Sequence, residues 1–208
     1  MAALARPSLR AGWLARLGRL YSRGVAIGYG AVVVVLAARG HDVGPAEVVR
    51  LALVTLSLTG GVVALAAARA GVPDVSSDPL ATVARLRGMD AGSIGWARAV
   101  AAIQVVAQST AVPALVVAGA AVGASGSLAA AIEAAPLVPG ALAYSIFASA
   151  VLGGLSRWAA DLAPRHGGAA FAGLLLAPEV IRAVLPDAPS IIGGLGWLLD
   201  HVVRAGGA

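Results

Sequence analysis

Few side chains in this sequence could take part in chemistry, and those that could lie mostly within long apolar stretches. Glu179 and Arg182 stand three positions apart after Pro178, a spacing at which two side chains share a helix face and could pair. The other polar candidates in apolar surroundings are amides and hydroxyls: Gln104, Gln108, Thr55 and Thr59. Because ionisable groups in such segments are costly, they commonly serve a substrate pathway. We interpret all these side chains as pathway or interface candidates, with hydrogen bonding between helices as the alternative for the amides and hydroxyls.

Several classes of chemistry are excluded by residues that the sequence lacks. It contains no Cys, which excludes disulfides, thiol nucleophiles and iron–sulfur ligation. Its 15 basic residues are all Arg, and without Lys it can form neither a Walker A phosphate loop nor a Schiff base. His41, His166 and His201 lie far apart without metal-ligand spacing, so we expect no metal and no cofactor on this chain. Any ATP-driven role therefore needs a second polypeptide that binds the nucleotide.

The composition indicates an integral membrane protein. Of the 208 residues, 59% are hydrophobic and only 12% are charged, and the mean hydropathy is +0.88; soluble proteins have about 25% charged residues. The apolar stretches recur to the end of the sequence, unlike the single short core of a secretory signal. The net charge of +5 comes from Arg residues that fall between these stretches, which does not indicate nucleic-acid binding.

The apolar stretches predict an all-α, polytopic membrane helix bundle that forms a single domain over residues 1–208. A spanning helix needs about 20 apolar residues, and we predict about six spans: 21–38, 47–68, 94–122, 137–155, 167–185 and 191–203. The last stretch is short, and a tilted span, a half-span and an interfacial helix all remain open for it.

The placement of Arg predicts the orientation of these spans. With the N-terminus in the cytoplasm, twelve Arg residues lie on the inner side and three, Arg39, Arg50 and Arg182, on the outer side. Cytoplasmic loops of membrane proteins carry such an excess of basic residues. We therefore expect both termini in the cytoplasm. Dense Ala, Gly, Val and Arg without Lys are typical of a genome rich in G and C, which suggests a bacterial inner membrane.

Two surface helices are expected beside the spans. Residues 7–23 combine Trp and Leu on one side with Arg on the adjacent side, a pattern typical of an amphipathic helix in the headgroup plane; the alternative is a simple positive topology signal. Residues 79–87, between the second and third spans, follow the capping residue Asp78 and end at Gly88. This second helix carries an apolar stripe of Leu80, Val83 and Leu86 beside Arg85 and Arg87.

One motif is similar to an enzyme signature. Gly123-Ala124-Ser125-Gly126 resembles the GxSG motif of rhomboid intramembrane proteases, and His166-Gly167-Gly168 also resembles that family. The resemblance implies Ser125 as nucleophile and His166 as base, two groups that must lie within hydrogen-bond reach. The Arg distribution places them on opposite sides of the membrane, so proteolysis is kept only as an alternative.

The overall layout resembles the membrane subunit of a type-2 ABC transporter. An amphipathic helix precedes the first span, a short helix at 79–87 follows the second, and Arg98 leads into the third. A basic turn at 163–168 then leads into the apolar run 174–178. The compact length is similar to that of the haem-exporter B-type permeases of cytochrome c maturation.

This resemblance implies an exporter permease rather than an enzyme. Two protomers, identical or different, would form the substrate pathway in the lipid bilayer, with spans two and five at their interface. A separate ABC ATPase would bind ATP and dock on the coupling helix 79–87. The implied docking residues are Asp78, Leu80, Val83, Arg85, Leu86, Arg87, Met89 and Asp90. A non-catalytic membrane assembly or scaffold subunit is the remaining alternative, and the substrate is not indicated.

Overall fold

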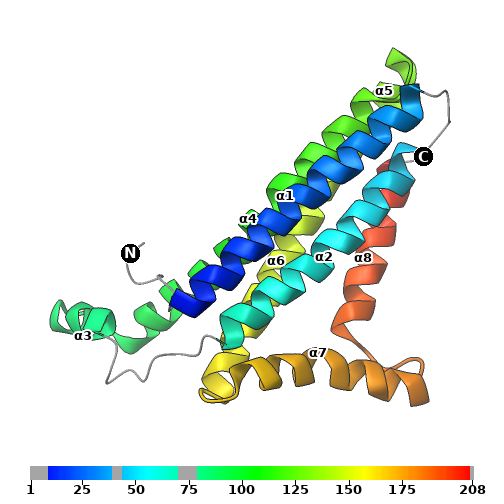
Figure 1. Cartoon of the computed structure of the whole chain (residues 1–208). Coiled ribbons are helices and arrows are strands. Elements are labelled where there is room, and N and C mark those ends of the chain that lie inside the picture. The colour runs from blue at the N-terminus through cyan, green and yellow to red at the C-terminus, as the bar shows by residue number, and fades with distance from the viewer. Residues whose placement is uncertain (1–8, 39–43, 70–78, 207–208) are drawn as a thin grey trace.

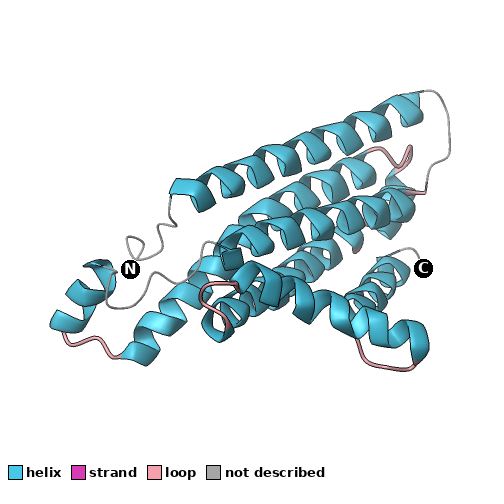
Figure 2. Cartoon of the chain, turned by 60° about the horizontal axis from the view of Figure 1, so that its bottom comes forward, coloured by secondary structure: helices cyan, strands magenta, loops and turns pink. Residues whose placement is uncertain are grey.

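The chain folds as a helix bundle whose described residues contain no β-strand. The computed structural model describes residues 9–38, 44–69 and 79–206 (Figure 1). The helices in these ranges are α1 (Leu9–Ala38), α2 (Pro45–Arg69), α3 (Pro79–Leu86), α4 (Ala91–Gly123), α5 (Leu128–Ala134), α6 (Leu137–Leu162), α7 (Gly167–Val184) and α8 (Ile191–Gly206). Short loops join most of them, as Figure 2 shows from a second direction.

Within the described residues, four helical segments are long and apolar enough to cross a membrane. They are Pro45–Ala68, Gly92–Gly123, Leu128–Leu162 and Gly167–Val184. The chain is therefore all-helical and compatible with a membrane-embedded protein, whereas the predicted count of six spans is not confirmed. The expected interfacial helix at 7–23 does not form a separate element in the described part, because α1 runs without a break from Leu9 to Ala38.

Four helices, α1, α2, α4 and α6, run side by side and form the bundle (Figure 1). Small residues allow their backbones to approach closely, as is common where membrane helices pack. A Cβ atom added at Gly153 of α6 would lie 2.6 Å from the Cα of Ile103 in α4, closer than atoms can pack. Gly60 of α2 similarly faces Thr110 of α4. The first contact packs α6 against α4, and the second packs α2 against α4.

Contacts between α1, α2, α4 and α6 show that neighbours in sequence run antiparallel. Tyr29 of α1 bonds Thr55 of α2, while Gly18, further back in α1, faces Val63, further on in α2. We call the end where α1 and α4 begin and α2 and α6 end the Arg-rich end, after residues 10, 16, 19, 23, 69, 98 and 157. The other end, where α2 and α6 begin, is the distal end.

The last two helices leave and then rejoin the bundle. α7 packs through its first turns, where Gly167 lies so close to the carbonyl of Ala68 that a Cβ would collide with it and Phe171 is buried. Its remaining turns diverge from the bundle (Figures 1 and 2). α8 then runs to the distal end, where Asp200 pairs with Arg50 at 2.9 Å and Val202 contacts Gly140.

The direction of α8 differs from the predicted topology. With both termini on one side, α8 would finish at the Arg-rich end, where α1 begins, but its last turns lie at the distal end. The predicted topology lets the chain cross from the Arg-rich end to the distal end in one helix and return in the next. Because α7 diverges from the bundle axis, α7 and α8 together lead only once from the Arg-rich end to the distal end. The expectation that both termini share one side is thus not confirmed. Arg204 lies at the distal end with α8.

Candidate functional site

The helix α3 projects from the Arg-rich end beyond the bundle (Figure 1). Its side chains divide between a small core and an open face. Ala84 is buried with Ile94 of α4, and Met89 packs against both. Val83 and Leu86 are 46% and 83% exposed, and Arg85 and Arg87 are also exposed. α3 therefore presents a mixed apolar and basic surface outside the bundle.

The end of α3 is fixed by a Schellman motif. Gly88 has a φ of +80°, a conformation that glycine adopts without steric cost. The amide of Met89 donates to the carbonyl of Ala84 at 3.0 Å, and the amide of Gly88 donates to the carbonyl of Arg85 at 2.9 Å. The contact between Met89 and Ala84 is the hydrophobic contact that usually accompanies this motif. The turn after α3 is therefore a defined structure.

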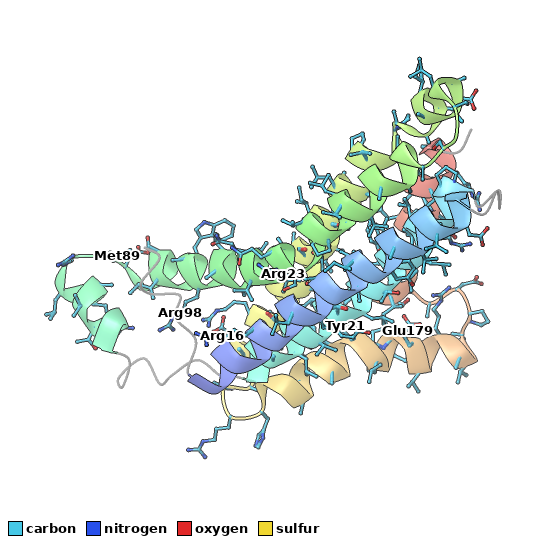
Figure 3. The ribbon with its side chains drawn as sticks, turned by 45° about the horizontal axis from the view of Figure 1, so that its top comes forward. Arg16, Tyr21, Arg23, Met89, Arg98 and Glu179 are labelled. Carbon is cyan, nitrogen blue, oxygen red and sulfur yellow. The ribbon has the colours of Figure 1, made fainter. Side chains whose placement is uncertain are left out.

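The next helix begins directly after this turn. Asp90 is the N-cap of α4, and its carboxylate accepts a hydrogen bond from the amide of Ser93 at 3.3 Å. The hydrogen bonds from Ser93 lower the pKa of Asp90 below its ordinary value, because they favour the charged form. Only four residues separate α3 from α4, so a displacement of α3 would be passed to a helix that runs the length of the bundle. Figure 3 shows Met89 in this turn.

Some predicted docking residues are not described. Asp78 lies outside the described residues, and Leu80 lies in α3 without a described side chain. Val83, Arg85, Leu86, Arg87, Met89 and Asp90 are all brought together in α3 and the turn that follows it.

The predicted pathway residues are not brought together. Gln104 and Gln108 are exposed on the outer face of α4. Thr55 accepts or donates a hydrogen bond with Tyr29 at 3.1 Å and also donates to the carbonyl of Leu51, while Thr59 donates to the carbonyl of Thr55. These hydroxyls serve packing between and within helices, which is the alternative that the sequence left open.

The polar groups that do meet inside the bundle lie on α6. Ser149 is buried and bonds the hydroxyl of Thr110 at 2.8 Å, and Tyr144 bonds the hydroxyl of Ser57 at 3.0 Å. The sequence reasoning missed Tyr144 and Ser149. The signal was present in the spacing, because Ser145, Ser149 and Ser156 recur at intervals that keep them on one helical face.

Glu179 and Arg182 do not form the pair that their spacing predicted. Arg182 instead bonds the carbonyl of Pro186 at 3.4 Å and the hydroxyl of Ser190 at 3.3 Å. Ser190 in turn caps α8 by accepting from the amide of Gly193 at 2.9 Å. Arg182 thus fixes the turn between α7 and α8. Glu179 (Figure 3) keeps one buried carboxylate oxygen without a hydrogen bond.

The protease alternative has no site in this arrangement. Ser125 follows the distal end of α4, where its hydroxyl donates to the carbonyl of Ala121 at 3.2 Å. His166 lies in the turn after α6, at the Arg-rich end. The 26 residues of α6 separate the two ends by about 39 Å, at 1.5 Å per residue. A serine and a histidine so far apart cannot act as nucleophile and base.

No cluster of three or more metal-ligating side chains occurs among the described residues. Comparisons of the chain with protein-family models, with curated proteins and with solved structures each gave no match, so its function has to be inferred from the features above.

Proposed function

We propose that this chain is the membrane-spanning permease subunit of an ABC-type exporter, driven by a separate ATPase subunit that docks on α3. The observation that carries the proposal is the position of α3, a helix outside the bundle with exposed Val83 and Leu86 beside two Arg residues. A mixed apolar and basic surface of this kind suits a soluble protein partner with an acidic rim. The Arg-rich end would face the cytoplasm of a bacterial cell, where such an ATPase works.

The connection between α3 and α4 supports a mechanical role. The Schellman turn and the Asp90 cap join the two helices through four residues. α4 then packs against α1, α2 and α6, so closure of a docked ATPase would tilt the centre of the bundle. Pro113 lies buried near the middle of α4 and has no amide to bond the carbonyl of Ser109, which makes this position a natural point for bending.

A second protomer would cover apolar faces that this chain leaves open. On α2, an exposed stripe recurs at helical spacing: Leu51, Val54, Leu58, Val62 and Leu65. On α7, the exposed side chains include Leu176, Val180 and Val184. The pathway would then form between two copies or between this chain and a related one. Glu179, with its unpaired carboxylate oxygen, is the ionisable group in this region that could line it.

The proposal is tested by purifying the tagged chain in mild detergent from its source cells. We expect an ATPase with a Walker A motif to co-purify in stoichiometric amount. Leu86→Asp places a charge on the exposed face of α3 and should reduce its recovery at least tenfold. The matched control is Leu128→Asp, a leucine that is 78% exposed on α5 at the distal end. The proposal fails if no ATPase accompanies the wild-type chain, or if both variants retain it equally.

A further inference from the structure

The turn between α7 and α8 lies near the middle of the height of the bundle. α8 runs antiparallel to α6, and Val202 of α8 is in contact with Gly140 of α6. Ile191, where α8 begins, is 11 residues before Val202, which is about 16 Å at 1.5 Å per residue. The same length along α6, which extends over Leu137–Leu162, leads from Gly140 to about Val151. The turn before α8 is therefore level with the centre of α6 (Figure 2).

The contact between α8 and α2 gives the same level. Asp200 pairs with Arg50 near the start of α2, and Ile191 is nine residues before Asp200. The same step along α2, which extends over Pro45–Arg69, leads from Arg50 to about Thr59. α2 and α6 both belong to segments that are long and apolar enough to cross a membrane. Their centres therefore correspond to the middle of a hydrocarbon core, about 15 Å from each surface.

The residues of this turn are not suited to contact with lipid. Leu185, Pro186 and Asp187 are exposed and lie outside regular helix. Arg182 is also exposed, and its hydrogen bonds to the carbonyl of Pro186 and the hydroxyl of Ser190 hold it at the turn. Irregular backbone at this depth is tolerated only where it is buried in protein or lines a water-filled cavity. A water-filled cavity is favoured, because a covering protein would have to remove water from the charges of Arg182 and Asp187.

Glu179 adds a carboxylate to this region (Figure 3). One of its oxygens is buried without a hydrogen bond, while Arg182 is held against Gly193 at the start of α8. Between residues 167 and 199 the charged residues are Glu179, Arg182 and Asp187, and the adjoining stretches 51–68 of α2 and 137–156 of α6 contain none. Two carboxylates against one guanidinium leave one negative charge in excess at the middle of the membrane.

The surroundings of Glu179 indicate the type of cation that would balance this charge. A bound metal ion takes several oxygen ligands, and no group of three or more metal-ligating side chains occurs in the part of the chain that the structure describes. Leu176, three residues before Glu179, shares its side of α7, and Val180 adjoins it. Both side chains are more than half exposed. A carboxylate beside an open apolar surface suits an organic cation, in which apolar groups surround a single positive charge.

We infer that Glu179 and the turn between α7 and α8 form a binding site for a monovalent organic cation, in a water-filled cavity at the middle of the membrane. The carboxylate of Glu179 balances the charge of the cation, and the apolar side of α7 contacts its body. The inference names a substrate class for the proposed permease and rests on that function. The measurements below need no ATPase, so the site can fail while an ATPase co-purifies, and the reverse.

The cavity is tested by cysteine modification in reconstituted vesicles, with reagent on both sides. Ala188→Cys in the turn should react readily with water-soluble methanethiosulfonates, because the reactive thiolate forms in water. After each rate is divided by that of a free thiol, the trimethylammonium reagent should react at least fivefold faster than the sulfonate reagent, which is repelled. Val112→Cys is the control, since Val112 is 62% exposed on α4 and its neighbour at 110 faces Gly60 at the same depth. Facing lipid, it should hardly react.

Binding is tested with tetraphenylphosphonium and with tetraphenylborate, an anion of nearly the same shape. The cation should bind the purified chain in equilibrium dialysis and protect Ala188→Cys from modification, and the anion should do neither. Glu179→Gln should weaken binding of the cation at least tenfold, whereas Glu179→Asp, which keeps the charge, should retain most of it.

Three results would overturn the inference: equally slow modification of Ala188→Cys and Val112→Cys, equal binding of the two probes, or unchanged binding of the cation by Glu179→Gln. The preference of Ala188→Cys for the cationic reagent does not depend on the folding of a Glu179 variant. Its absence would therefore also overturn the inference, even if Glu179→Gln proved unstable.

Discussion

At the scale of single residues, the packing of the bundle depends on the positions of glycines and on hydrogen bonds between hydroxyl groups. Gly153 allows α6 to touch the backbone of α4, and Ser149 bonds Thr110 one turn away from that contact. In lipid, helix association has little hydrophobic driving force, so close packing and such hydrogen bonds carry much of it. The sequence shows the small and hydroxyl residues, but which helix faces them is a property of the folded chain.

Substitution of Gly153 should show how much this contact contributes. In Gly153→Ala the new methyl group would lie 2.6 Å from the Cα and 2.8 Å from the backbone N of Ile103, so the two helices must move apart. We expect a loss of about 1–3 kcal/mol in unfolding free energy, the usual cost of overpacking, measured by denaturation in mixed micelles.

The neighbouring glycine is the control for this measurement. Gly154 has no atom within 4 Å of the position that its Cβ would occupy. Gly154→Ala should therefore leave the stability unchanged or raise it by up to about 1 kcal/mol through helix propensity. Equal losses for both variants would mean that α4 and α6 do not touch at Gly153.

At the scale of elements, local sequence signals predicted much of the helical framework. The predicted range 79–87 and the observed α3 differ at one end by a single residue, because the Asp-Pro start and the Gly stop are local signals. α6 extends beyond the predicted 155 to Leu162, where Arg157 and Asp161 pair one turn apart. The seven-residue α5 was missed, although Ser127 caps it. A helix of two turns leaves too short an apolar pattern to detect.

The stability that the N-cap contributes to α4 depends on pH. Hydrogen bonds from Ser93 lower the pKa of Asp90 in the folded chain, so the cap contributes its stability at neutral pH. This contribution is lost as the pH falls through the lowered pKa. We expect the amide resonance of Ser93 to move in that acidic range, below the ordinary range of Asp, in an NMR titration of the chain in micelles.

The variant Asp90→Asn distinguishes the effect of the negative charge of Asp90 from the effect of its capping hydrogen bond. Asn is as good an N-cap as Asp but does not titrate, so the variant should keep the first turn of α4 while the Ser93 amide no longer responds to acid. A midpoint for the wild-type chain at or above the ordinary Asp value would contradict the hydrogen bond between Asp90 and Ser93.

At the scale of the whole molecule, the path of α7 decides the topology. The sequence predicted the bounds of α7 well, with 167–185 expected and Gly167–Val184 observed. For α8, the predicted and the observed helix both start at residue 191. It did not predict that α7 would diverge from the bundle, because the direction of a helix depends on tertiary contacts such as those of Gly167 and on the turn held by Arg182. The reversal of α8 follows from that direction.

This topology can be tested directly because the chain has no Cys of its own. Arg165→Cys in the turn after α6 and Arg204→Cys near the end of α8 should lie on opposite sides of the membrane. A membrane-impermeant maleimide added to intact cells should label Arg204→Cys and leave Arg165→Cys unlabelled until the cells are opened. Glu133→Cys, exposed on α5 at the distal end, should label together with Arg204→Cys. If Arg165→Cys and Arg204→Cys are both protected in intact cells, α8 returns to the cytoplasm, and the path of α7 and α8 described above is wrong for the protein in the membrane.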